Sequence, residues 1–427
     1  MKRIPYLAAL FAAASLFTAS LSVHAQDAVP AGAAVQDDRV VITGGGSLLP
    51  VNNPPNGSGF YNLAWNPGGT KLAYIFSDTE FVSHIAVTDA SATDPIVLDT
   101  GALEAGFPVS WTPDGQILYV GSGDFTDTSK PYTSELKRIA PEAGAVPEVI
   151  GSFEMGTGCG GGSPFPSDWV YWEEAGFGGN ALVLRWTDYG ILHSSNCGGS
   201  SLKLFAPQGG EDTPLVGDNY LEPVEGEPQF AVGRAVLSGD GKTLVAVRST
   251  YNADGPVTSL VLIDLSTREL TDVTTTAQPE QVAWLADGSV LYSTRTTTGS
   301  LNAGLTDEQK TNFESIFGTS EFDVPAYEVA IHHLNPATGE DSQLYTAPAS
   351  VIGRMQIAPD GQSLLFSQIA NLDQWVLGIA DGTLDIMADN DGSAQRALVP
   401  VTLYRLPFAG GEATVIAENL AQFRLKP

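Results

Sequence analysis

The chain is poor in basic residues. It has 20 Lys and Arg, of which only eight are Lys, against 49 Asp and Glu, so its formal net charge is −29 over 427 residues. Proteins that bind nucleic acid or anionic membrane surfaces use clustered Lys and Arg. We therefore expect neither nucleic acid nor a membrane surface among its partners.

Long apolar runs are missing too, except at the N-terminus. Lys2 and Arg3 precede an apolar run over 7–21, and small residues around Ala25 form a cleavage site. These features are typical of a secretory signal peptide, and no later segment approaches the 18 apolar residues of a membrane helix. We expect residues 1–25 to be removed and the protein to be periplasmic or secreted, without a membrane span.

Cysteine is nearly absent, since only Cys159 and Cys197 occur. Both have glycine neighbours, and in an oxidising compartment two cysteines suffice for one disulfide. The alternatives are a pair of free thiols or a metal site, which would need more ligands than two cysteines supply. We expect the disulfide.

What the chain does have is enough apolar material for a core, with 43% hydrophobic residues, 46 Gly and 27 Pro, and a sequence repeat. Each copy has an apolar stretch that ends in Trp or a large aliphatic residue, followed by a turn that contains Asp-Gly or Gly-Gly. The clear copies are Leu63–Gly69, Val109–Gly115, Ala235–Gly241, Val282–Gly288 and Met355–Gly361. A degenerate copy is assigned to 170–172. The six reference residues stand at positions 65, 111, 172, 237, 284 and 357.

The repeat predicts a β-propeller. Asp-Gly is a strong signal for a tight hairpin turn, and a second hairpin follows each first one, so each unit has four strands. Four-stranded units that recur about every 45 residues or more are typical of propeller blades. We expect six blades over 60–427, preceded by an N-terminal segment (26–59) with one closing strand at Val40–Ile42. A seventh, minimal blade built from that strand and 420–425 is the alternative.

The best copies of the motif, Trp111–Gly115 and Ile357–Gly361, resemble the TolB-like family of bacterial periplasmic propellers with WD-like repeats. The resemblance covers most of residues 60–417 and implies a propeller fold and the periplasm. It does not imply an activity, because the motif is a turn rather than a site. We expect the chain to lack the N-terminal α/β domain of TolB, and also the C-terminal hydrolase domain of prolyl-oligopeptidase-like relatives.

Nearly all insertions fall on one face of the expected propeller, where the second and third strands and successive blades are joined. One insertion, 296–326, contains Thr306 and Gln309 with the spacing of a helix capping box. Another, 369–400, contains Asp389 and Asp391, which resemble part of a calcium-binding loop. The first and last ligands of such a loop are missing, so we expect a solvated acidic loop and no cofactor, with calcium as the alternative.

Candidate binding residues stand three positions before each reference residue, where the innermost strands should open into the central channel. They are Asn62, Pro108, Trp169, Arg234, Gln281 and Arg354. Two arginines at such places in an acidic chain are notable, because Arg suits carboxylate recognition. They could also neutralise neighbouring Asp residues or backbone carbonyls. The functional interpretation is an anionic ligand, such as a peptide terminus or a uronic acid.

Catalytic signals are few, and no nucleophile elbow, zinc-binding helix or phosphate loop occurs. His193 and Tyr189, with Arg185 nearby, could abstract a proton beside a carboxylate. We expect a monomeric, exported scaffold that binds an envelope protein or peptide through its looped face and channel mouth. The alternative is an enzyme or binder of acidic polysaccharide, acting as a lyase or glycan hydrolase.

Overall fold

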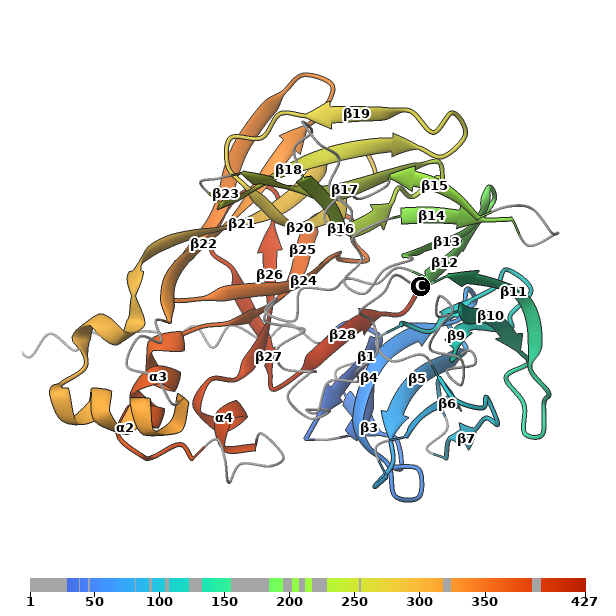
Figure 1. Cartoon of the computed structure of the whole chain (residues 1–427), viewed down its shortest axis with the longest axis horizontal. Helices are drawn as coiled ribbons and strands as arrows, with labels where there is room; N and C mark the ends of the chain where they lie inside the picture. Colours follow the sequence, from blue (N-terminus) through green and yellow to red (C-terminus); the bar gives the residue numbers. More distant parts are fainter. Residues whose placement is uncertain are drawn as a thin grey trace, which may run out of the picture.

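Antiparallel sheets of four strands form a ring of seven blades (Figure 1). The computed structural model describes residues 29–37, 39–44, 47–80, 82–91, 94–103, 107–122, 133–154, 184–194, 202–206, 212–216, 229–252, 255–317, 324–385 and 393–427. Strand order in each sheet follows the sequence, apart from one sheet that joins the two ends of the described chain. The predicted all-β propeller of four-stranded blades is confirmed. The expected count of six is wrong, and the alternative of seven is correct.

Blades 2 to 4 follow one another along the chain. Blade 2 consists of β4 (Ser58–Trp65), β5 (Lys71–Ser77), β6 (Ser83–Asp89) and β7 (Ile96–Val97). Blade 3 consists of β8 (Ser110–Trp111), β9 (Ile117–Gly121), β10 (Thr133–Ile139) and β11 (Glu148–Glu154). Blade 4 consists of β12 (Leu184–Thr187), β13 (Gly190–Ser194), β14 (Leu202–Phe205) and β15 (Asp212–Val216).

Blades 5 and 6 have the longest strands, and blade 7 follows them along the chain. Blade 5 consists of β16 (Gln229–Leu237), β17 (Thr243–Asn252), β18 (Gly255–Asp264) and β19 (Leu270–Val273). Blade 6 consists of β20 (Pro279–Trp284), β21 (Val290–Ser300), β22 (Pro325–Asn335) and β23 (Glu340–Pro348). Blade 7 consists of β24 (Val351–Ile357), β25 (Ser363–Ile369), β26 (Val401–Pro407) and β27 (Thr414–Glu418).

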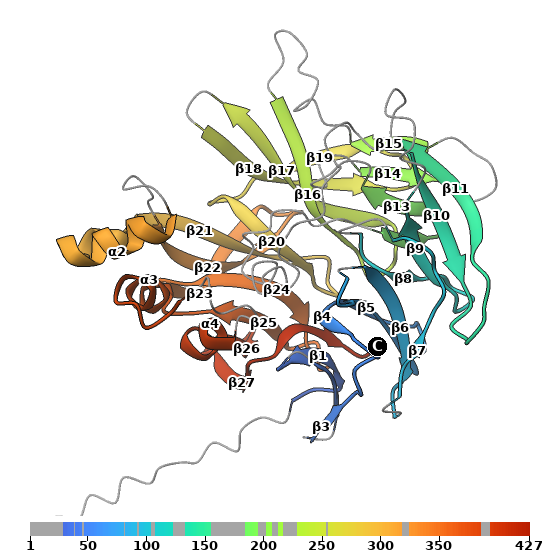
Figure 2. The same ribbon diagram turned by 60° about the horizontal axis from the view of Figure 1, so that its bottom comes forward.

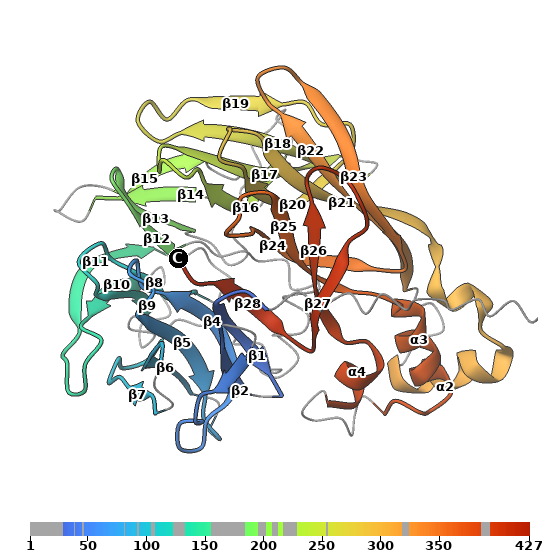
Figure 3. The ribbon, with the colours of Figure 1, turned by 180° about the vertical axis from the view of Figure 1, so that it is seen from behind.

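Blade 1 closes the ring with strands from both ends of the described chain. It consists of β28 (Ala421–Leu425), β1 (Gly32–Gln36), β2 (Arg39–Gly44) and β3 (Ser47–Pro50). Figures 1 and 3 both show β28 beside β1, running toward the middle of the ring. The segment 26–59 therefore contributes three strands rather than the single closing strand expected. The seventh blade is complete, which is why a count of internal repeats alone missed it.

The assignment of blade 4 was also wrong. With the degenerate copy at 170–172 as the first strand of this blade, the stretch around Trp186 would be its second strand. Leu184–Thr187 is instead the first strand of the blade and pairs with β13. The reference residue is therefore Trp186 instead of Trp172, which lies outside the described residues. The turn that follows Trp186 reads Thr187-Asp188-Tyr189-Gly190. It lacks the Asp-Gly pair by which the other copies were recognised.

The recurring tryptophan fastens one blade to the previous one. The indole Nε1 of Trp111 donates to the carbonyl of Ala64 at 2.9 Å, and Trp284 donates to Val236 at 2.9 Å. Trp65 makes the same bond to the carbonyl of Arg424 at 3.3 Å. In each case the acceptor lies on the first strand of the preceding blade. The first strands lie at the inner edge of the ring (Figures 1 and 2), where most of them contact the first strand of the next blade.

The two largest insertions form a small helical unit beside blades 6 and 7 (Figure 1). It contains η1 (Leu301–Gly304), α2 (Asp307–Phe317), α3 (Leu372–Ala380) and α4 (Ser393–Leu398). The predicted capping box is confirmed, because Thr306 N donates to Gln309 Oε1 at 2.8 Å and Gln309 N to Thr306 Oγ1 at 3.3 Å. Phe313 and Trp375 are buried in the core of this unit.

Candidate functional site

The candidate site is built on β-bulges in the first strands. The pairing register shifts around Asn62, Arg234 and Arg354, and next to Gln281, so the bulge recurs at the same place in four blades. A bulge places two residues opposite one partner and can re-aim a side chain away from the regular alternation. The pairing register of the first strands is therefore irregular about three residues before the reference residue.

β28 of blade 1 carries the same irregularity. Its register shift spans Gln422, which stands three residues before Leu425 and is 1% exposed. Sequence reasoning missed Gln422, although the segment 420–425 was suspected to be the first strand of another unit. Counting back three residues from Leu425, as in the other copies, would have found it.

At three of these positions the backbone is left-handed. The φ angles are +54° at Asn62, +25° at Arg234 and +54° at Gln422. Such a conformation costs a residue with a side chain on the order of 1–3 kcal/mol, whereas glycine adopts it freely. The chain nevertheless places polar side chains here, which is typical of positions where the side chain itself has a role.

The bulge residues lie outside the hydrophobic cores between blades. Val232 and Ala235 pack into the core shared by blades 4 and 5, while Arg234 between them belongs to no core. In the same way, Ile352 and Met355 pack between blades 6 and 7, but Arg354 does not. Arg234, Arg354 and Asn62 are only half-buried, as expected of side chains at the mouth of a channel.

Hydrogen bonds connect these residues from blade to blade. Arg234 Nη1 donates to Gln281 Oε1 at 2.5 Å, which links blades 5 and 6. Asn62 N donates to Gln422 Oε1 at 2.9 Å, which links blades 2 and 1. Asn62 Nδ2 also reaches the carbonyl of Phe107 at 3.4 Å, next to the predicted Pro108. The structure therefore brings Arg234 and Gln281 together, and separately Asn62 and Gln422.

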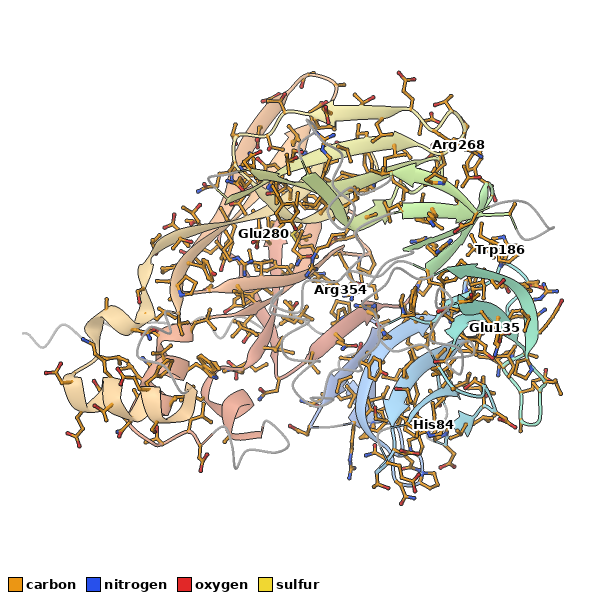
Figure 4. All side chains as sticks on the ribbon, viewed as in Figure 1. His84, Glu135, Trp186, Arg268, Glu280 and Arg354 are labelled. Carbon is orange, nitrogen blue, oxygen red and sulfur yellow. The ribbon has the colours of Figure 1, made fainter. Side chains whose placement is uncertain are left out.

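Arg354 lies near the middle of the ring in Figure 4. Its backbone N–H donates to Ser367 Oγ at 2.9 Å, which fixes the strand at this point. Its Nε is buried without a hydrogen-bond partner, and no described residue forms an ion pair with its guanidinium. A guanidinium left in this state is costly unless an anion or water satisfies it.

The first strands differ in charge from the rest of the chain. They contain no Lys, no Asp and only one Glu, Glu280, whose carboxylate pairs with Arg295 at 2.6 Å. Their basic residues are Arg185, Arg234, Arg354 and Arg424. The whole chain has 49 acidic residues against 20 basic ones, so the channel lining reverses the overall balance. Its field favours an anionic ligand.

The two predicted catalytic residues are not brought together. His193 is fully buried on β13, where its Nε2 lies 2.7 Å from Asp212 Oδ1 and its ring lies 4.4 Å from that of Phe153. Tyr189 lies in the turn before β13, at the opposite end of that strand. Four residues of strand separate them by about 13 Å.

The environment of His193 is a closed network rather than a reactive one. Burial raises the pKa of the Asp212 carboxyl, but the hydrogen bond from His193 and the positive charges of His193 and Lys203 outweigh burial, so the pKa lies below its usual value. Lys203 Nζ lies 3.5 Å from Asp212. The Asp212 carboxylate is thus held ionised between two partners and serves the packing of blade 4.

Several predicted residues lie outside the described part of the chain. They are Trp169, Cys159, Cys197, Asp389 and Asp391. Trp169 was chosen because it stands three positions before Trp172, but the reference residue of blade 4 is Trp186. The disulfide and the calcium alternative stay predictions. The N-terminal segment 1–25 is also outside the description, and none of the described helices is long and apolar enough to cross a membrane.

No protein-family model matches the chain, and no curated protein matches it. Among solved structures, TolB from Acinetobacter baumannii is similar at 16% identity and a TM-score of 0.40, over 74% of this chain and 63% of that one. The β-propeller domain of the Trilobed protease from Pyrococcus furiosus is similar at 12% identity and a TM-score of 0.46, over 91% and 98%.

A putative 6-phosphogluconolactonase from Bacteroides uniformis is similar at 13% identity and a TM-score of 0.45, over 90% of this chain and 94% of that one. The part of the TolB structure that this chain covers, 63%, is less than two thirds of its length. Likenesses of this size carry no argument about activity. The function has to be argued from the channel itself.

Proposed function

We propose that this propeller is an exported binding protein that takes the carboxylate end of a protein or peptide into the mouth of its channel. The observation that carries the proposal is the guanidinium of Arg354, which is partly buried near the ring axis and has no partner among the described residues. Arg binds carboxylates through paired N–H groups. A carboxylate would accept hydrogen bonds from the Nη groups of Arg354, which pair with no described residue.

The neighbouring groups support a carboxylate at this place. Gln281 holds Arg234 through its amide oxygen, so Arg234 is oriented before a ligand arrives. Gln281 itself is held from its backbone, where its N–H donates to Ser293 Oγ at 3.2 Å. Pre-orientation of this kind lowers the entropy lost on binding. Arg234 and Arg354, on blades 5 and 7, would then contact the ligand from two sides of Gln281.

The proposal includes a location in the cell envelope, for which the features of residues 1–25 are the support. The alternative, a lyase or hydrolase acting on acidic polysaccharide, gains little from the geometry. His193 is enclosed and paired with Asp212, and Tyr189 lies at the other end of the blade. A polysaccharide enzyme would need at least one of them beside the arginines.

The test is a binding assay with two neutral peptides of the same sequence, one with a free C-terminal carboxylate and one with a C-terminal amide. Fluorescence anisotropy of N-terminally labelled peptides should give a dissociation constant about tenfold or more lower for the carboxylate, from one charge-assisted interaction. The Arg354→Gln variant should lose that preference. Arg268→Gln is the matched control, because Arg268 is exposed and lies at the rim of the ring (Figure 4).

Equal binding of the two peptides would refute the proposal. So would a preference for the carboxylate that persists in Arg354→Gln. Consumption of an acidic oligosaccharide by the wild-type protein, seen as absorbance of unsaturated products, would favour the enzyme instead.

A further inference from the structure

We propose that Arg185 forms a second anionic subsite next to the channel mouth, at the junction of blades 4 and 5, so that the ligand is a peptide whose C-terminal residue is acidic. The inference rests on the proposed function, because it takes the C-terminal carboxylate to be bound at Arg234 and Arg354. Arg185 would then bind the carboxylate of the last side chain.

The packing of β12 decides which way Arg185 faces. Its neighbours Leu184 and Trp186 both pack into the core between blades 3 and 4. Successive side chains of a strand point to opposite faces, so Arg185 faces blade 5. Its partner in the register of the sheet is Leu192, which belongs to the core between blades 4 and 5.

Within the described chain, the first strands of blades 4 and 5 are less closely paired than those of the other junctions, although the two blades share a hydrophobic core. Among the described residues, β12 contacts β8 and β9 of blade 3, but it has no comparable contact with β16 of blade 5. The other first strands contact the first strand of the next blade. Arg185 is correspondingly exposed to solvent. An exposed side chain on an innermost strand is within reach of a ligand at the channel mouth, which is the position that the proposal gives it.

Arg185 also has no charge partner within the described chain. The carboxylate of Asp212, on the same blade, is already held by His193 and Lys203. Desolvation lowers the pKa of its guanidinium. A solvent-accessible cation without a counter-ion among the described residues, in a chain of net charge −29, offers an anion a favourable charge interaction.

The positions of Arg185 and Arg234 set the spacing of the two anionic groups. Arg185 stands one residue before its reference residue Trp186, and Arg234 stands three residues before Leu237. Arg185 and Arg234 lie on equivalent strands of adjacent blades, so their positions differ by two residues. Two residues of strand correspond to about 7 Å along the strand direction. A C-terminal Glu carries two carboxylates separated by a short flexible chain, and the long arginine side chains can adjust to it.

The aromatic residues of the first strands favour a peptide over a sugar chain. Trp65, Trp111 and Trp284 use their indole N–H groups to fasten blades together. Trp111 is buried, and the ring of Trp65 is covered by Lys426, whose Nζ lies 5.7 Å from the ring centre. The rings of Trp65 and Trp111 are therefore not free faces on which a sugar could stack.

The experiment compares four labelled peptides with one neutral sequence, ending in Glu or in Gln, each as a free acid and as an amide. We expect the free acid ending in Glu to bind the wild-type protein about tenfold or more tightly than the free acid ending in Gln, because it adds one charge-assisted interaction. In Arg185→Gln that preference should vanish. Arg185→Lys should keep part of it, because Lys retains the charge without the paired geometry.

The controls separate this inference from the proposed function. Arg354→Gln should weaken both free acids, and Arg268→Gln should change neither. If the acids ending in Glu and Gln bind equally well and both depend on Arg354, the second subsite is wrong and the proposed function stands. If neither acid binds better than its amide, both are wrong. If an oligouronide binds through Arg185 while no peptide does, the peptide is the wrong occupant. Melting temperatures of all variants, measured without ligand, exclude loss of folding as the cause.

Discussion

Replacing Phe423 by alanine should destabilise the protein by about 3–5 kcal/mol, the usual range for a buried aromatic residue. Phe423 is 2% exposed, and its ring lies directly over Gly32, where an added Cβ would come within 2.8 Å of it. Its side chain joins a core with residues of blades 1 and 7. Removing roughly 200 Å² of buried surface at about 25 cal/mol per Å² amounts to ~5 kcal/mol, part of which relaxation of the surroundings recovers.

The backbone around Phe423 shows why this strand matters for the whole ring. Gln356 Nε2 of blade 7 donates to the carbonyl of Phe423 at 2.7 Å, and Arg424 Nε donates to the carbonyl of Leu63 in blade 2 at 3.1 Å. β28 is thus held from both sides. Phe423→Ala should therefore loosen blades 7, 1 and 2 together.

Urea unfolding followed by tryptophan fluorescence measures the effect. Val415→Ala on β27 is the control, because Val415 is 40% exposed and should change stability by less than about 0.5 kcal/mol. A loss of stability in Phe423→Ala no larger than in this control would refute the conclusion that β28 closes the ring. It would favour a six-bladed ring with a peripheral C-terminal strand.

Three further predictions concern single contacts. Asp212→Asn should cost about 1–3 kcal/mol at pH 7, because it leaves the buried His193 without its carboxylate. The pKa of Asp212 is lowered in the folded protein, so this stability is present above the unfolded value of about 3.9 and is lost as the pH falls through the folded value. The difference in melting temperature between variant and wild type should therefore shrink as the pH is lowered below about 4, and a difference that stays constant would contradict the assignment. Trp111→Phe should cost about 1–3 kcal/mol in urea unfolding, because the carbonyl of Ala64 loses its donor; a neutral result would mean that the indole bond does not fasten the blades. Thr306→Ala should weaken the start of α2 by about 1 kcal/mol, visible as faster amide exchange over 307–317, and unchanged exchange would deny the capping box its role.

Much of the fold could be predicted because its turns are chemically distinctive. Gly115, Gly241, Gly288 and Gly361 all have positive φ, between +64° and +86°, which a residue with a side chain adopts only at a cost. The turns therefore recur as Asp-Gly in the sequence and mark the hairpins. The capping box at Thr306 was readable for a similar reason, since it depends on two side chains three residues apart.

Blade 4 shows where this method fails. Its first turn ends in Gly190 with φ +137°, but Asp188 and Tyr189 precede that glycine. Because the apparent copy at 170–172 has an aromatic residue at the expected place, it was taken for the first strand of blade 4. The assignment of the strands in this blade was therefore shifted by one. The same error placed Arg185 on a second strand, although it lies on the first strand of the blade. Arg185 was therefore not considered among the residues of the innermost strands.

The closing blade escaped detection for a different reason. β1 pairs with β28 across nearly the whole length of the chain, with Gly32 opposite Leu425. No local turn connects these strands, so no sequence pattern marks their pairing. The only indication of this pairing was that Val40–Ile42 and 420–425 would otherwise be strands with unpaired edges. That requirement depends on the whole ring and not on the sequence of either segment.

Most residues of the proposed binding site are those that break the strand pattern. A regular first strand would direct every side chain into a core between blades, as Val232 and Ala235 are directed. The bulge at Arg234 interrupts that alternation and leaves one side chain for the channel. Because the bulge recurs at the same distance from the reference residue, counting three positions back identifies the bulge residues Arg234 and Arg354, and their role in binding is our proposal. Arg185 follows no such rule, because it lies one residue before its reference residue and outside the bulge. Its charge, in a lining from which almost all acids are excluded, is what distinguishes it.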